Sequence, residues 1–174
     1  MTPNKSLSFP QAIQATQSLM EKINSQELDE NAIEKEVSTI VNNKNGGRGF
    51  FVAYLTSDLS LSDEPSEGII NGLKSAMDIV GELLVKNLAM SSAMTITHSR
   101  NNDFKNVKGS QRVYERTNNL IKQIKLDLVR QELEKLKVTI VNGEGDYNDF
   151  LERWNYDTEQ RQGIQQAVIN ALTE

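Results

Sequence analysis

Residues 87–99 read NLAMSSAMTITHS, and this stretch, bounded by Lys86 and Arg100, contains no Asp, Glu, Lys or Arg. Its residue types permit a helix, and a helix that faced water would carry charged side chains on its outer face. The stretch is too short and too polar to cross a membrane. We therefore expect a buried helix at the centre of the fold.

The sequence on both sides of this stretch has the periodicity of helices. The chain has no proline after Pro65, and this proline-free part is rich in Lys, Glu, Gln, Leu and Ala, which permits long helices. Apolar residues recur every three or four positions over 9–24, 29–42, 66–100, 110–141 and from 157 onward. A break is expected near Ser75 or Gly81. The prediction is an all-α, irregular multi-helix bundle.

Length and local signals set the domain organisation. A chain of 174 residues is long enough for one domain with a sizeable core. Ser8 with Gln11 has the spacing of a capping box, so the first helix should begin directly after Ser8. We expect a disordered tail over residues 1–8 and a single helical domain over residues 9–174.

The segment 49–56, GFFVAYLT, is ambiguous. Its aromatic and β-branched residues favour a strand, but it is short and does not alternate cleanly. Only residues 138–141 offer a partner strand. A short buried helix is the prediction. The alternative is an α+β fold with a minor two-stranded sheet of 50–56 paired with 138–141.

The longest helical pattern, over residues 110–141, carries two apolar stripes on different faces. The first is Val113, Thr117, Leu120 and Ile124, and the second is Leu126, Val129, Leu133, Leu136 and Ile140. An unbroken helix of this span would be roughly 48 Å long at about 1.5 Å per residue, whereas a compact domain of this size is about 40 Å across. The helix should bend, break before residue 138, or project. We predict an antiparallel homodimer through the second stripe.

Composition excludes several kinds of chemistry. The chain has no cysteine, which excludes disulfides, thiolate metal sites and cysteine nucleophiles. His98 is the only histidine, and no Glu-x-x-His pair exists for a di-iron bundle. A net charge of −5 argues against general nucleic-acid binding and against anionic membranes. No signal-peptide core precedes the first helix. We expect a cytoplasmic protein with no membrane association, no metal and no cofactor.

Three polar groups on the neutral stretch are candidate ligand-binding residues. Ser91, Thr95 and His98 lie at i, i+4 and i+7, hence on one helix face, where they would line a small-molecule pocket. The competing interpretation is structural, because Ser and Thr inside helices usually bond back to a carbonyl and a histidine near a helix end usually caps carbonyls.

The glycine-rich segment 46–49, GGRG, is a candidate anion site. Glycines let a backbone wrap an anion, and Arg48 would pair with it. The segment matches neither the dinucleotide fingerprint nor the phosphate loop. A helix C-cap followed by a tight turn is the expected structure.

Four cations form a stripe at 3-4-4 spacing. They are Lys105, Lys108, Arg112 and Arg116. Such a stripe is either a solvated helix face or a patch for a phosphate-bearing or acidic partner, with a nucleic-acid accessory role as the weaker interpretation.

The segments GGRGFFVAYLT at 46–56 and VKNLAM at 85–90 resemble a group of small cyanobacterial proteins with no assigned activity, over residues 46–125. The resemblance implies no reaction and no binding site. The sequence therefore favours a non-catalytic helical protein that acts through protein–protein contacts. The alternative is a small-ligand sensor or enzyme with a polar pocket formed by Arg48, Ser91, Thr95 and His98.

Overall fold

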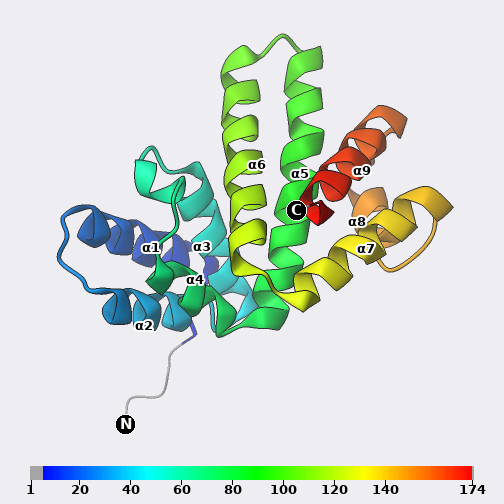
Figure 1. Ribbon diagram of the computed structural model, residues 1–174. Helices are drawn as coiled ribbons and strands as arrows, with labels where there is room; N and C mark the ends of the chain where they lie inside the picture. Colours follow the sequence, from blue (N-terminus) through cyan, green and yellow to red (C-terminus); the bar gives the residue numbers. More distant parts are fainter. Residues whose placement is uncertain (1–5, 174) are drawn as a thin grey trace. The chain divides into compact units, whose positions relative to one another are not determined.

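The computed structural model describes residues 6–173, and every regular element in this range is a helix (Figure 1). The helices are α1 (Phe9–Asn24), α2 (Glu30–Ile40), α3 (Lys44–Thr56), η1 (Ser60–Ser62), α4 (Glu67–Lys74), α5 (Met77–Arg100), α6 (Phe104–Ile124), α7 (Asp127–Asn142), α8 (Asn148–Arg153) and α9 (Thr158–Leu172). The all-α prediction is confirmed. The alternative two-stranded sheet is wrong, because residues 50–56 lie in α3 and residues 138–141 lie in α7.

The chain forms two compact units, an N-terminal unit up to Leu83 and a C-terminal unit from Leu84 onward. Helix α5 begins in the first unit and continues in the second. The expectation of a single domain over 9–174 stays a prediction. Residues 1–5 of the expected tail lie outside the described residues, and Ser8 is the N-cap of α1.

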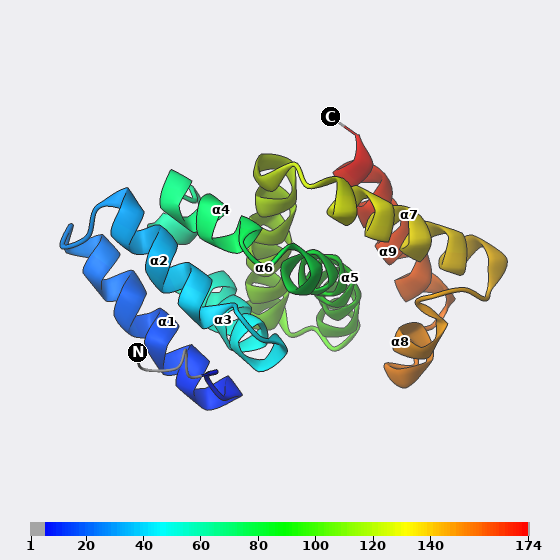
Figure 2. The ribbon, with the colours of Figure 1, turned by 90° about the horizontal axis from the view of Figure 1, so that it is seen from below.

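In the N-terminal unit α1 packs along α3, and α2 packs along α4 (Figure 2). Short polar side chains begin all four helices: Ser8, Asp29, Asn43 and Ser66 each accept a hydrogen bond from a backbone N–H in the first turn. The predicted capping box is present, because the Gln11 N–H donates to Ser8 Oγ at 3.3 Å and the Ser8 N–H donates to Gln11 Oε1 at 3.0 Å.

The turn expected at the glycine-rich segment 46–49 is wrong. Helix α2 ends at Ile40, the Asn43 side chain caps α3, and the glycines form the first turns of α3 itself. A Cβ at Gly47 would lie 2.9 Å from side-chain atoms of Ile79 and Leu83. Glycine is needed there for close helix packing rather than for a turn.

Glycines also let α4 approach α2 closely. A Cβ at Gly72 would lie 2.5 Å from Val37 Cβ, and one at Gly68 would lie 2.9 Å from Ile33 Cβ. The spacing of these two glycines thus marks a contact between helix backbones.

Helix α5 contains the neutral stretch and begins after a break at Ser75 and Ala76, as expected. Leu88, Ala89 and Ala93 are fully buried, whereas Met94 is 37% exposed. The stretch is therefore core on one face only. By length and composition alone α5 is able to cross a membrane, with a mean hydropathy of 1.3 over its most apolar window. A core helix meets the same criteria, and half of that window is buried inside the protein.

In the C-terminal unit α5 and α6 form an antiparallel hairpin, and α7 packs along α9 (Figure 1). The long helix expected over 110–141 is wrong, because the chain breaks at Lys125, which adopts a left-handed conformation with φ 49° and ψ 43°. Helix α6 also begins earlier than expected, at Phe104. The two apolar stripes lie on different faces because they belong to two helices.

The second stripe is buried within the unit. Val129, Leu133 and Leu136 are at most 2% exposed, whereas Leu126 and Ile140 are partly exposed, so most of the surface on which the homodimer prediction depended is covered by the chain's own helices. The homodimer stays a prediction, but the second apolar stripe no longer supports it.

Candidate functional site

The polar stripe of α5 bonds along its own helix. Ser91 Oγ donates to the Asn87 carbonyl at 2.8 Å, and Thr95 Oγ1 donates to the Ser91 carbonyl at 2.8 Å. His98 Nδ1 lies 3.8 Å from Asp103 Oδ2 in the adjoining loop, and hydrogen bonds from Asn106 lower the pKa of that aspartate. The hydroxyls thus follow the structural interpretation, in which Ser and Thr bond back to their own helix.

Arg48 belongs to the N-terminal unit, whereas Ser91, Thr95 and His98 belong to the C-terminal unit. The guanidinium carbon of Arg48 lies 5.0 Å from the centre of the Phe9 ring, a cation–π contact between α3 and the start of α1. The observed role of this arginine is to cover an aromatic ring.

The basic stripe is only partly a surface feature. Lys105 and Lys108 are exposed, Arg112 is half-buried, and Arg116 is 4% exposed. The exposed part lies along the first turns of α6 beside Phe104, whose side chain is 66% exposed. Because it is buried, Arg116 is not part of the exposed basic patch.

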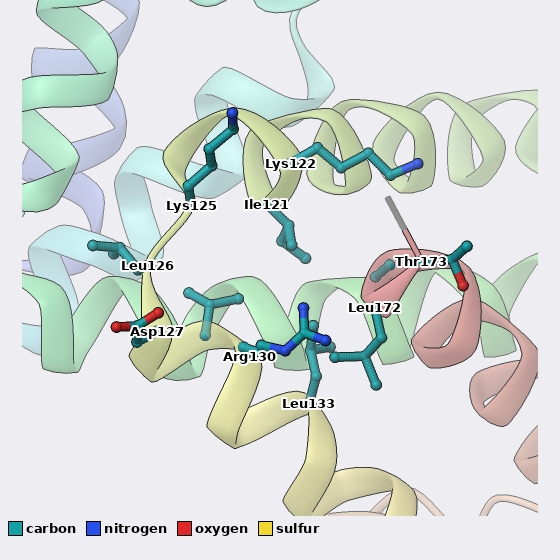
Figure 3. Close-up of a pocket in the computed structure, with 11 residues that line it drawn as sticks. Ile121, Lys122, Lys125, Leu126, Asp127, Arg130, Leu133, Leu172 and Thr173 are labelled. Carbon is teal, nitrogen blue, oxygen red and sulfur yellow. The ribbon is translucent and has the colours of Figure 1, made fainter.

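The described residues form a groove in the C-terminal unit, where α6 ends, α7 begins and α9 ends (Figure 3). Its volume is about 470 Å³, within the range of sites that hold small ligands or partner side chains. We name it the α6–α9 groove. It is lined by Ile121, Lys122, Lys125, Leu126, Asp127, Val129, Arg130, Leu133, Ala171, Leu172 and Thr173.

The break at Lys125 makes this groove possible. Lys125 ends α6 with its N–H directed to the Ile121 carbonyl at 3.4 Å, and α7 starts after Leu126, whose side chain does not cap the helix. The chain therefore changes direction, so that the end of α6 and the start of α7 both line the groove. Ile121 points from α6 into the groove, and Leu133 and Leu172 approach from α7 and α9 (Figure 3).

Cations outnumber carboxylates on the lining. Lys122, Lys125 and Arg130 are exposed, and Asp127 is the single carboxylate among the described lining residues. In Figure 3 the Arg130 side chain rises from α7 between the apolar residues, Lys122 extends along the edge of α6 toward the end of α9, and Lys125 points to the far side of α6. Within residues 6–173 no ion pair involves these three cations.

Polar contacts hold α9 in place against α5. The Arg100 guanidinium donates to Asp157 at 2.7 Å and pairs with Glu159 at 3.2 Å, and its hydrogen bond lowers the pKa of Asp157. One turn further on, Gln160 Nε2 donates to Thr97 Oγ1 at 2.8 Å. These contacts secure the start of α9, and its last turn forms a wall of the groove.

A second polar contact fixes α7. The Tyr147 hydroxyl donates to Glu132 Oε2 at 2.6 Å, and Lys135 pairs with the other oxygen of that carboxylate at 2.9 Å. Burial alone would raise the pKa of Glu132, but these two hydrogen bonds outweigh it and lower the pKa.

Sequence reasoning missed the groove, although one signal was present. The interval from Ile124 to Leu126 is only two residues, which shifts the apolar stripe to another face and marks a break. No local signal in the sequence shows that the end of α9 lies beside the end of α6 and the start of α7.

Among the described residues, no three His, Asp or Glu side chains come together as a metal site would require.

Comparison with protein families gives one match. The model of the family described as "Uncharacterised conserved protein UCP020893" matches residues 8–171, a range that covers most of both units. Neither the curated proteins nor the solved structures contain a match to the chain.

Proposed function

We propose that this chain, a member of the UCP020893 family of conserved proteins, is a non-catalytic binding protein that docks a segment of a protein partner in the α6–α9 groove. The observation that carries the proposal is the groove's construction. Three helices supply an apolar floor, and one side is left open with cations at its edge. Grooves of this kind between helices receive apolar side chains of a partner helix.

The polar face of α5 supports binding rather than catalysis. Ser91 and Thr95 donate to carbonyls of their own helix, and His98 faces Asp103 rather than a hydroxyl. A hydrolytic site needs a nucleophile within hydrogen-bond reach of a base that a third group orients. No observation of comparable weight favours a polar pocket near residues 91–98.

Site-specific photo-crosslinking tests the proposal. A photo-reactive residue is placed at Lys122, on the groove edge, or at Lys108, on the same helix outside the groove. We expect a discrete adduct with another protein in cells from position 122 and none of that size from position 108. Leu172→Asp, which puts a charge on the groove wall, should abolish the adduct. Equal adducts from both positions, or an adduct that survives Leu172→Asp, would refute docking in the groove.

A further inference from the structure

We infer that the segment received by the α6–α9 groove is an acidic amphipathic helix, whose apolar face meets the groove floor and whose carboxylate is held between Arg130 and Lys122. The inference rests on the proposed function and adds the chemistry of the partner.

Charge is the first argument. The chain as a whole carries a net charge of −5, so its average field repels an acidic partner. At the groove the balance is reversed: Lys122 and Arg130 lie along it with one carboxylate, Asp127, on the described lining, whereas Lys125 points to the far side of α6. A locally positive groove on a negatively charged protein is complementary to an acidic partner. Such electrostatic complementarity selects the partner and its orientation.

The position of Arg130 is the second argument. Its guanidinium rises beside the apolar residues of the groove and has no ion-pair partner among residues 6–173 (Figure 3). An apolar segment that covered it would bury an unpaired charge, which is costly. A carboxylate removes that cost, because a guanidinium binds it through two parallel hydrogen bonds. Lys122 from α6 would complete the pairing from the opposite wall.

The shape of the groove argues for a helix. Strand addition needs an exposed sheet edge, and the described part of the chain contains no strand. The lining instead consists of side chains on helix surfaces, of which Leu126, Ala171 and Leu172 are partly exposed and Ile121, Val129 and Leu133 are nearly buried. Such a surface accepts residues at i, i+3, i+4 and i+7 of a docked helix.

Two designed peptides test the inference. Each has about 18 residues, long enough to form a helix, with leucines along one face. One carries Glu on the flanks and its twin carries Lys at the same positions. By fluorescence anisotropy with the full chain, we expect the Glu peptide to bind at least about tenfold more tightly than the Lys peptide, with a preference that weakens in salt.

Variants locate the effect. Arg130→Glu should remove or reverse the preference, and Arg130→Gln, which keeps a polar side chain, should remove it without reversal. The control is Arg153→Glu, an exposed arginine on α8 away from the groove lining, which should leave the preference unchanged. Circular dichroism checks that each variant remains folded.

The outcomes separate the inference from the proposed function. If the Glu and Lys peptides bind equally well, and Leu172→Asp abolishes the binding of both, the inference of an acidic partner is wrong. The proposal that a partner docks in the groove then still stands. Dodecanoate, which has an apolar chain and a carboxylate but no helix, is a third probe. If neither peptide binds, or if dodecanoate alone binds in a way that depends on Arg130, the partner is not an acidic helix. The crosslinking experiment then decides by itself whether a partner docks in the groove. A preference that Arg153→Glu removes as effectively as Arg130→Glu would also overturn the inference, because the effect would come from general charge.

Discussion

A Cβ built on Gly49 of α3 would lie 2.6 Å from the Cβ of Ala12 in α1, and 2.7 Å from the Phe9 carbonyl oxygen. Carbon atoms in contact normally lie about 3.5–4.0 Å apart. Helices α1 and α3 therefore meet with almost no side chain between their backbones. The contact also explains why Ala12, with the smallest side chain that has a Cβ, is fully buried opposite the glycine.

Gly49→Ala should destabilise the protein by about 1–3 kcal/mol, because the added methyl forces the two helices apart. The matched control is Gly109→Ala in α6, where an added Cβ meets nothing within 4 Å. That substitution should stabilise by about 1 kcal/mol, since alanine is the better helix former. Urea unfolding followed by circular dichroism measures both. Stabilisation by both substitutions would contradict the close packing of α1 on α3.

Lys125→Gly should stabilise the protein by about 1 kcal/mol, because a left-handed conformation strains lysine and does not strain glycine. In an unbroken helix the same change would destabilise by about 1 kcal/mol. The sign of the effect thus distinguishes a break at this residue from a continuous helix. Lys122→Gly, inside α6, is the control and should destabilise. Thermal unfolding compares the two variants with the parent.

The features predicted correctly from the sequence depend on interactions close in the chain. Ser8 with Gln11 forms the predicted capping box because the motif needs only residues three positions apart, and Asp157 with Gln160 has the same spacing and forms another. The break near Ser75 and the helical periodicity are local in the same way. The all-α class follows from many such signals that agree with one another.

The features that were missed depend on residues far apart in the sequence. The sequence around Gly49 predicts a turn, because the residue that requires glycine there, Ala12, lies two helices earlier in the chain and comes close only in the fold. The break at Lys125 has no glycine or asparagine to mark it. The groove needs α6, α7 and α9 together, and no single segment encodes their meeting.

Leu133→Glu should destabilise the C-terminal unit by about 3–5 kcal/mol, because the side chain is 1% exposed and a carboxylate there would be buried without a partner. Val138→Glu is the control on the same helix. Val138 is 50% exposed, so this change should cost little. Denaturant unfolding gives both values. If Leu133→Glu only dissociated a folded dimer, seen by sedimentation equilibrium, the stripe would be a subunit contact and the burial of Leu133 within one chain would be wrong.

Tyr147→Phe should destabilise by about 1 kcal/mol at pH 7, because it removes a hydrogen bond to a carboxylate that is partly exposed. The folded-state pKa of Glu132 lies below its usual value, since the hydrogen bonds from Tyr147 and Lys135 outweigh the effect of burial. Stability gained from a lowered carboxylate pKa is present above the unfolded-state pKa and is lost as pH falls through the folded-state pKa. The difference in the free energy of unfolding between variant and parent should therefore narrow below about pH 4.

The control is Tyr114→Phe in α6, whose hydroxyl forms no hydrogen bond within residues 6–173. This variant should show no such pH dependence. Unfolding curves between pH 3 and pH 8 (roughly the range that brackets carboxylate titration) decide the matter, and a gap that widened in acid would show that Tyr147 does not stabilise the ionised form of Glu132.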